Sequence, residues 1–161
     1  MLEEQRLDTA FHDCATFDCG VPALNEYLAK FASQHRRRGI SQTYVLVDAE
    51  WPKAVLGYYS LSAAQIDAAQ ISETDRKRLP RYPIPCFRMG RLACQKDQHG
   101  KGIGGLLIGC AVDRCLKARE EVASYALIVD AKDERAKAFY EHYGFTPCMD
   151  QPNTLYLLFG K

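Results

Sequence analysis

The sequence lacks the two signals that direct a chain to or across a membrane. It contains no run of eighteen apolar residues, which a transmembrane helix requires. Its first residues, MLEEQRLDTAFHD, are acidic and polar, unlike the basic and then apolar start of a secretory leader. These absences predict a cytoplasmic protein with no membrane partner.

Internal repeats, linkers and low-complexity tracts are also missing. The 161 residues, 47% of them hydrophobic and 25% charged, are enough to form one sizeable core. We therefore expect a single domain over residues 1–161.

The cysteines form no C-x-x-C pair, and their number is odd. This pattern argues against a disulfide framework and against a zinc site, so we expect no metal. We interpret the cysteines as reduced thiols, most of them small core residues. The seven are Cys14, Cys19, Cys86, Cys94, Cys110, Cys115 and Cys148.

Acidic residues are absent from one stretch of a chain whose net charge is only +1. The stretch Arg76–Arg91 (RKRLPRYPIPCFRMGR) holds six basic residues and no acidic one, and a second basic cluster, HRRR, lies at His35–Arg38. This distribution fits a protein that meets a polyanion on one face. The alternative is a solvated helix end together with scattered loop arginines.

Hydrophobic periodicity predicts the elements of the fold. The predicted helices are Ala23–Arg38, Ile103 to about Lys117, and Glu134–Tyr143, with a short helix or loop in SETDRKRLPRYP. The predicted strands are Thr43–Ala49, Val55–Ile66, Cys86–Gln95, Ser124–Ala131 and Thr154–Phe159. The first two strands are expected to pair antiparallel. The order predicts an α/β (α+β) fold with a mixed central β-sheet flanked by helices on both faces.

Four glycines lie within HGKGIGGLL (His99–Leu107), directly ahead of an apolar helix. The segment matches the dinucleotide fingerprint G-x-G-x-x-G, with Asp130 as a possible ribose-binding acid. That fingerprint needs its first glycine at the end of a strand, whereas QKDQH lies between Cys94, near the end of the predicted strand, and Gly100. A Walker P-loop needs Ser or Thr after its lysine, and Lys101 is followed by Gly102. The context therefore argues against both nucleotide motifs.

A glycine-rich turn without a ligand is the remaining alternative, but each glycine within a helix costs about 0.5–1 kcal/mol relative to alanine. We favour a loop whose backbone N–H groups, with those of the first helical turn, bind a pyrophosphate. Glycine lets the backbone approach phosphate oxygens without an intervening Cβ.

Three segments together resemble the GNAT acetyltransferase family. They are the strand RLACQ, the loop HGKGIGGLL in the place of that family's (Gln/Arg)-x-x-Gly-x-(Gly/Ala), and DERAKAFYEHYGF. With FDCGVPALNEYL, SQTYVLVD, VLGYYSLS and YPIPCFRMGRLA, the resemblance narrows to the GNAT toxins of bacterial type II toxin–antitoxin systems. His99 departs from the pattern, because it stands where Gln or Arg is usual.

The resemblance implies a GNAT fold, acetyl-CoA as the cofactor and a set of residues that bind it. Backbone atoms of Leu92, Ala93 and Cys94 are expected to hold the pantetheine and polarise the acetyl carbonyl. The loop residues expected to bind the pyrophosphate are His99, Gly100, Lys101, Gly102, Ile103, Gly104 and Gly105. Ala131, Phe139 and Tyr143 are further expected contacts of the cofactor.

Tyr140 is the expected catalytic residue, as the general acid that protonates the departing thiolate. A phenol of pKa about 10 can protonate a thiolate whose thiol has a pKa near 8.5. The expected acceptor is an α-amino group, whose pKa is only about 7.7–8.0. No strong base is needed to deprotonate it. The alternative for a tyrosine on a helix is core packing. Cys94 as a nucleophile lacks an orienting third group, and His142 is expected at the surface.

The resemblance also implies the acceptor, the α-amino group of an aminoacyl-tRNA, and a cognate ribbon-helix-helix antitoxin. A homodimer is expected. The basic stretches fit this acceptor, because aminoglycoside or polyamine acceptors call for carboxylates instead. Arg88 and Arg91 are three apart on a strand, so at most one can point toward a given ligand. The expected tRNA contacts are Arg36, Arg37, Arg38, Arg76, Lys77, Arg78, Arg81, Arg88 and Arg91.

Two other functions stay open at this point. One is a GNAT acetyltransferase that acts on a protein N-terminus, a peptide or a small amine. The other is a protein without catalytic activity that binds acyl-CoA as a sensor or serves only in protein interactions.

Overall fold

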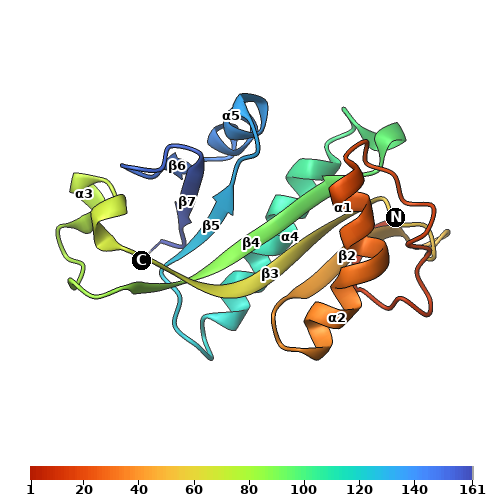
Figure 1. The fold of residues 1–161 in the computed structure, drawn as a ribbon, viewed down its shortest axis with the longest axis horizontal. Helices are drawn as coiled ribbons and strands as arrows, with labels where there is room; N and C mark the ends of the chain where they lie inside the picture. The colour runs from red at the N-terminus through yellow and green to blue at the C-terminus, as the bar shows by residue number, and fades with distance from the viewer. Residues whose placement is uncertain (161) are drawn as a thin grey trace. The chain divides into compact units, whose positions relative to one another are not determined.

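The computed structural model describes residues 1–160, and these form one mixed seven-stranded sheet with helices, in the strand order β1-β2-β3-β4-β5-β7-β6 (Figure 1). The strands are β1 (Leu2–Arg6), β2 (Gln42–Asp48), β3 (Gly57–Ile66), β4 (Ile84–Cys94), β5 (Ala126–Asp130), β6 (Thr146–Pro147) and β7 (Thr154–Leu158). The α-helices are α1 (Pro22–Glu26), α2 (Ala32–Arg37), α3 (Glu73–Arg76), α4 (Ile103–Ala118) and α5 (Glu134–His142). The π-helix η1 (Tyr27–Phe31) and the 3₁₀ turns η2 (Ala68–Gln70) and η3 (Lys96–Gln98) complete the set. The predicted mixed sheet is confirmed.

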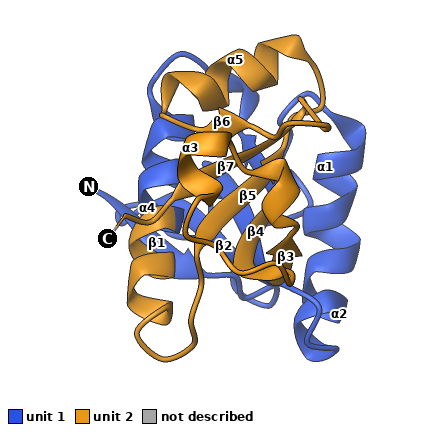
Figure 2. Cartoon of the chain, turned by 90° about the vertical axis from the view of Figure 1, so that its left-hand side faces the viewer, with its two compact units in different colours: residues 1–62, 90–111 blue, residues 63–89, 112–161 orange. Residues whose placement is uncertain are grey.

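The chain divides into two compact units, coloured separately in Figure 2. Unit 1 comprises residues 1–62 and 90–111, and unit 2 comprises residues 63–89 and 112–161. Strands β3 and β4 and helix α4 each contribute residues to both units. The units are described one at a time below.

Unit 1 carries helices on both faces of its strands. Strands β2 and β3 pair antiparallel with Val45 opposite Tyr58 and Leu46 opposite Gly57. Val45 and Tyr58 pack in one core cluster with Leu28 of η1. Gly57 faces the other way, because side chains alternate along a strand, and there the position of its Cβ meets side chains of α4.

The first helical segment ends where the sequence predicts, at Gly39, which has a φ of +72°. It differs from the prediction in one turn, since Tyr27–Phe31 forms a π-helix between α1 and α2. The wider turn accompanies a hydrogen-bonded Tyr27, whose hydroxyl lies 3.1 Å from Nδ1 of His35 and 2.7 Å from Oγ of Ser41.

In unit 2, β4 pairs parallel with β5, and β5 pairs antiparallel with β7. Residues 126–129 of β5 are almost fully buried, as the continuous apolar run predicts for a strand covered on both faces. The short segment after β3 is fixed by Tyr156 of β7, whose hydroxyl accepts from the Ser72 N–H at 3.1 Å and lies 3.3 Å from a carboxylate oxygen of Asp75.

Two strands escaped the prediction. Strand β1 has the sequence LEEQR, whose single leucine gives no alternation, and it is held by backbone pairing with β2. Strand β6 has only two residues. Both strands are held by backbone hydrogen bonds to a neighbour, which place no requirement on the order of apolar and polar side chains. Periodicity in the sequence therefore could not find them.

The cysteines are free thiols, and four of the seven are buried as core residues: Cys19, Cys86, Cys115 and Cys148. Burial raises the pKa of the Cys86 thiol to about 11 and that of Cys115 to about 12. Among residues 1–160, no helix is long and apolar enough to cross a membrane, and no group of His, Cys, Asp and Glu has the arrangement of a metal site.

The close contact at Gly57 predicts a loss of stability in the variant Gly57→Ala. An added Cβ lies 2.9 Å from Cδ1 of Leu107 and 3.0 Å from the carbonyl oxygen of Ala93. Overpacking of this kind costs about 1–3 kcal/mol, which urea unfolding will measure. Gly109→Ala is the matched control, since nothing lies within 4 Å of its Cβ position. This control should instead stabilise α4 by about 0.5–1 kcal/mol, and equal effects of the two variants contradict the prediction.

Because His12 is buried, we expect the free energy of unfolding to decline in mild acid. Its Nδ1 accepts from the Asp8 N–H at 3.0 Å and its Nε2–H donates to Oε1 of Gln5 at 2.8 Å, so the neutral ring satisfies both contacts. Burial lowers the pKa of His12 from its usual 6.5, so below about pH 6.5 the unfolded chain binds more protons than the folded one.

The free energy of unfolding should therefore fall as pH decreases from about 7 to about 5, by at most about 1.4 kcal/mol per pH unit for this one group. Urea unfolding at both pH values measures the decline. His12→Asn should be less stable at neutral pH but should lack this contribution, whereas the exposed His142→Asn should keep it. An unchanged decline in His12→Asn contradicts the assignment.

Candidate active site

The glycine loop of unit 1 has the backbone geometry of an anion site. Gly100 and Gly102 have φ values of +81° and +79°, and nothing lies within 4 Å of either Cβ position. Helix α4 begins directly afterwards, and its first intrahelical bond runs from the Leu106 N–H to the Gly102 carbonyl at 3.1 Å. The N–H groups of residues 102–105 precede that bond, so they have no partner within the helix and can bind an anion.

His99 is tied to the strand that precedes the loop. Its Nε2 lies 3.0 Å from the carbonyl oxygen of Cys94, the last residue of β4. A carbonyl only accepts, so Nε2 carries the proton of this hydrogen bond. The side chain thus bridges the end of the strand and the start of the loop.

The end of β4 is anchored by the segment around Asp18. The Lys96 N–H donates to the Asp18 carbonyl at 2.8 Å, and the Lys96 ammonium lies 3.2 Å from the Asp18 carboxylate. The Gln95 N–H donates to the carbonyl of Leu56, the residue before β3, also at 2.8 Å. These bonds fix the strand end that carries the expected pantetheine contacts. Of those contacts, Ala93 is buried and Leu92 and Cys94 are half-buried.

The surroundings of Cys94 do not favour a nucleophilic thiolate. Burial raises the pKa of its thiol to about 11, so the thiol stays protonated at neutral pH. A thiolate is the reactive form, so the interpretation of Cys94 as a packing residue fits the structure.

Helix α5 in unit 2 carries a buried tyrosine, Tyr140, and the residue that follows the helix is an exposed tyrosine, Tyr143. Tyr140 is 8% exposed and its ring makes edge contacts with Phe139 and Phe145, at centroid distances of 5.4 and 5.5 Å. Tyr143 is 39% exposed and contacts Phe139 and the exposed ring of His142. Ala131, which follows β5, is buried.

Helix α5 is held by a capping side chain at its N-terminus and by a glycine after its C-terminus. The Asp133 carboxylate caps its N-terminus by accepting from the Ala136 N–H at 2.8 Å. Gly144 ends it with a φ of +93°, and the Tyr140 carbonyl accepts from the Phe145 N–H at 3.2 Å. The predicted surface position of His142 is confirmed.

Two of the arginines expected to contact tRNA are engaged within the protein. Arg88 pairs with Asp130, which also accepts from the Thr154 hydroxyl at 2.8 Å. Asp130 is thus engaged by two partners within unit 2. The Arg91 guanidinium lies over the Tyr27 ring, 3.6 Å from its centroid.

The other basic residues are distributed over both units. Arg76 is half-buried and lies 3.7 Å from Glu73. The exposed members are Arg36, Arg37 and Arg38 at the end of α2 in unit 1, and Lys77, Arg78 and Arg81 after α3 in unit 2.

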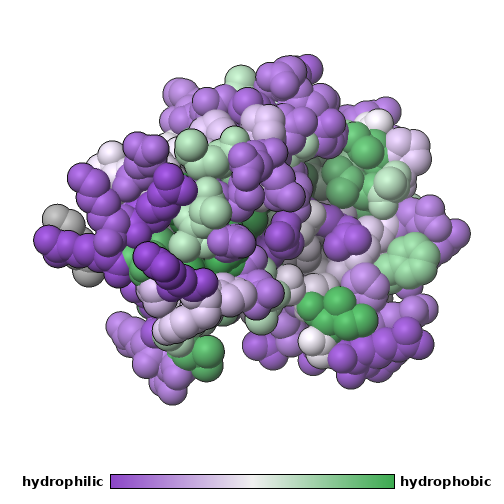
Figure 3. Space-filling view, turned by 60° about the vertical axis from the view of Figure 1, so that its left-hand side comes forward, coloured by the Kyte–Doolittle hydropathy of each residue, from purple (hydrophilic) through white to green (hydrophobic). Residues whose placement is uncertain are grey.

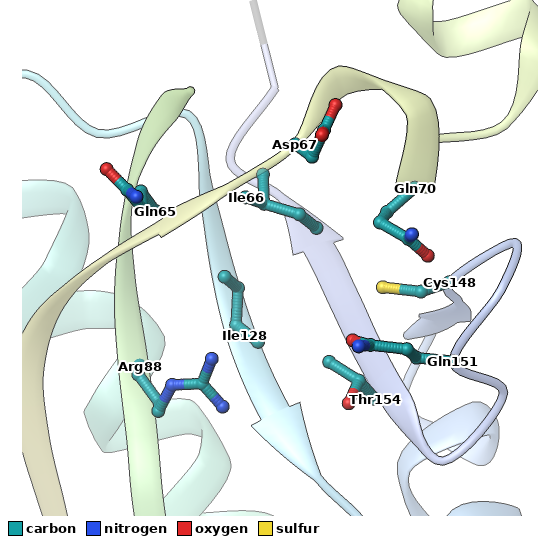
Figure 4. A pocket seen from close by; sticks show the side chains of 9 residues that line it. All are labelled: Gln65, Ile66, Asp67, Gln70, Arg88, Ile128, Cys148, Gln151 and Thr154. Carbon is teal, nitrogen blue, oxygen red and sulfur yellow. The ribbon is translucent and has the colours of Figure 1, made fainter. Parts of the chain in front are cut away.

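A pocket of about 190 Å³ lies in unit 2, where no sequence motif indicates one (Figure 4). Its residues come from four strands and from the turns beside them, so only the folded sheet brings them together. They are Gln65, Ile66, Asp67, Gln70, Arg88, Ile128, Cys148, Gln151 and Thr154.

Comparison with known proteins identifies the family. The model described as an acetyltransferase (GNAT) domain matches residues 41–147. The tRNA-acetylating toxin of Mycobacterium tuberculosis (strain ATCC 25618 / H37Rv) is 31% identical over 146 residues, which cover 91% of this chain and 86% of that protein.

Among solved structures, a Tyr-to-Phe mutant of KacT is 32% identical with a TM-score of 0.91, over 98% of this chain and 95% of that one. AtaT complexed with acetyl-methionyl-tRNAfMet is 31% identical, also with a TM-score of 0.91 and the same two coverages. Sequence and fold agree over nearly the whole chain. The chain therefore belongs to the GNAT family of acetyltransferases.

Proposed function

We infer that this protein transfers the acetyl group of acetyl-CoA to the α-amino group of an aminoacyl-tRNA and thereby blocks translation. The observation that carries this inference is the similarity over 91% of the chain to a tRNA-acetylating toxin. The structure of AtaT with acetyl-methionyl-tRNAfMet, which covers 98% of this chain, supports the same product class. An acetylated α-amino group cannot attack the next ester, so the tRNA is lost to translation.

The loop and the helix after it suit the pyrophosphate of acetyl-CoA. Two positive-φ glycines and the free N–H groups at the start of α4 offer backbone donors in a row, and the helix dipole adds to the attraction. His99 supports this arrangement from the strand side through its bond to Cys94. This proposed role is one of position, and it explains how histidine can stand where Gln or Arg is usual in the family.

Tyr140 is the proposed general acid. Bound acetyl-CoA supplies an activated thioester. In the transfer, the amine nitrogen forms a bond to the acetyl carbon, the carbon–sulfur bond breaks, and the Tyr140 hydroxyl gives its proton to the sulfur. The nitrogen attacks as a neutral amine and then loses one proton to water, and water returns a proton to the Tyr140 oxygen, so the enzyme is restored. The buried ring among Phe139 and Phe145 supports this choice over the exposed Tyr143, since a fixed acid transfers its proton more efficiently.

The exposed basic residues are the proposed contacts of tRNA phosphates. The face in Figure 3 is mostly hydrophilic, and its hydrophobic residues form separate small patches, which suits a charged partner better than an apolar one. Arg36–Arg38, Lys77, Arg78 and Arg81 are exposed. They are therefore the strongest candidates, while Arg76, Arg88 and Arg91 support the fold first.

The comparisons also support an antitoxin partner. AtaT has been solved bound to the C-terminus of the antitoxin AtaR. We extend this to a neutralising antitoxin of the ribbon-helix-helix type, to a homodimeric toxin and to action in the cytoplasm, where charged tRNA is found.

Acetyl transfer to charged tRNA is the test of this function. Incubation with acetyl-CoA and a mixture of charged tRNAs should give acetylated aminoacyl-tRNA, detected by mass spectrometry of the aminoacyl-adenosine. Tyr140→Phe should reduce the rate by about 100-fold or more, because general acids contribute that much, while acetyl-CoA binding persists. Tyr82→Phe is the control, because Tyr82 is an exposed tyrosine that is not among the expected cofactor or tRNA contacts, and its rate should stay within a few-fold of wild type. Turnover on peptides or small amines with no product on any charged tRNA would overturn the proposal.

The positive φ of Gly102 predicts weaker acetyl-CoA binding in Gly102→Ala. The left-handed conformation costs a non-glycine residue about 1–2 kcal/mol, so the affinity measured by calorimetry should fall about tenfold. Gly109→Ala introduces the same methyl group, also with nothing within 4 Å, at a position without positive φ. It should bind acetyl-CoA as wild type does. Equal affinity of the two variants removes the loop backbone from the proposed pyrophosphate site.

A further inference from the structure

The segment between α3 and β4 of unit 2 places an exposed aromatic ring among exposed basic side chains (Figure 1). Tyr82 is 65% exposed, and among residues 1–160 it has no hydrogen bond and no ring contact. Arg81 directly precedes it, and Lys77 and Arg78 lie a few residues before, all of them exposed. The ring therefore contributes nothing to the core and is available to a partner.

Both ends of this segment are fixed in unit 2. Leu79 is half-buried and packs against a core cluster that contains Ile84, which is itself buried. The carbonyl of Pro85 accepts from the Tyr125 N–H at 2.8 Å. Residues 80–83 lie between these anchored positions, and all four are exposed. The fold thus holds the two ends of a short loop that projects its side chains into water.

Two prolines restrict the backbone of this loop. Pro80 and Pro83 flank Arg81 and Tyr82, and a proline ring fixes its own φ near −65°. The residue before a proline is held in an extended conformation, and this applies to Tyr82. A backbone that is restricted before binding loses less conformational entropy when a partner arrives.

The charge around Tyr82 favours a polyanion as that partner. Residues 77–85 contain three basic residues and no acidic one. Trp51 of unit 1 is a still more exposed aromatic residue, at 71%, but it follows Glu50 and lies three residues after Asp48. Exposure of a ring alone therefore does not indicate a nucleic acid, whereas a ring among cations does.

An aromatic ring adds a selectivity that basic residues lack. Arginine and lysine bind the phosphates of duplex and single-stranded RNA alike. An aromatic side chain stacks on a base that is free to leave its neighbours, so it recognises unpaired nucleotides. A tRNA has such nucleotides at its 3′ end and in its loops.

We propose that Tyr82 stacks on an unpaired base of the acceptor tRNA while Arg81 binds a neighbouring phosphate. This inference rests on the proposed function, because the acceptor is taken to be a tRNA. The stack favours RNA with unpaired nucleotides over duplex RNA, and the basic residues attract both.

The test is the affinity for uncharged tRNA and for an RNA duplex without unpaired nucleotides, measured by fluorescence anisotropy without acetyl-CoA. Tyr82→Ala should weaken tRNA binding about 5- to 100-fold, the range expected for one stacked base, and leave duplex binding unchanged. Tyr82→Phe keeps the stacking face and should bind tRNA as wild type does. Arg81→Ala should weaken binding of both RNAs and lower the slope of log affinity against log salt by about 1.

Trp51→Ala is the matched control, since it removes a similarly exposed ring from an acidic segment and should change neither affinity. Because Tyr82 has no contact within the described residues, Tyr82→Ala should unfold at the same urea concentration as wild type. A tRNA without its unpaired 3′ nucleotides identifies the base. If Tyr82→Ala no longer matters on that RNA, the base belongs to the 3′ end, and if the loss persists, it belongs to a loop.

Three results overturn the inference. They are an unchanged tRNA affinity in Tyr82→Ala, an equal loss on the duplex, and a loss in Tyr82→Phe as large as that in Tyr82→Ala. The binding assay involves no acetyl transfer, so the two proposals can fail separately. A wild type that acetylates charged tRNA without any effect of Tyr82→Ala contradicts this inference alone. A wild type that shows the stacking effect but acetylates no aminoacyl-tRNA contradicts the proposed function alone.

Discussion

The candidate site depends on one close contact in unit 1, where a side chain has no room. At Gly57 of β3, the carbonyl of Ala93 near the end of β4 and the side chains of Ile103 and Leu107 on α4 all come within 3.2 Å of the Cβ position. This contact fixes β4, which is expected to hold pantetheine, against α4. The N-terminus of α4 is expected to hold the pyrophosphate. Their relative position follows from packing density, because interiors leave no space for an extra methyl group.

The loop between that strand and that helix combines backbone and side-chain constraints. Gly100 and Gly102 adopt a conformation that other residues avoid, and His99 closes the segment by bonding back to Cys94. The family position of His99 usually carries a Gln or Arg side chain. Here the imidazole is engaged with a strand carbonyl, so in the proposed site the backbone N–H groups at the start of the helix are the donors to phosphate.

Some basic side chains of this protein contact other residues of the fold, and others are exposed to solvent. Arg88 and Arg91 belong to the basic stretch, yet one pairs with Asp130 and the other stacks on Tyr27. The charges that stay exposed lie at helix ends and in the segment after α3, as at Arg36–Arg38 and Arg81. A count of basic residues therefore overestimates the surface that a polyanion meets, because strand residues point into neighbours whereas loop residues point into water.

The sequence alone determined the elements with strong periodicity, the glycine turns and the family motifs, because these depend on neighbours along the chain. The buried run of β5 and the extent of α5 were predictable for that reason. Only the tertiary structure decided which arginines remain exposed, that β1 joins the sheet, and that Ile128 and Gln151 share a pocket. These features arise from residues far apart in the chain, whose meeting depends on strand register and packing, and local pattern does not encode either.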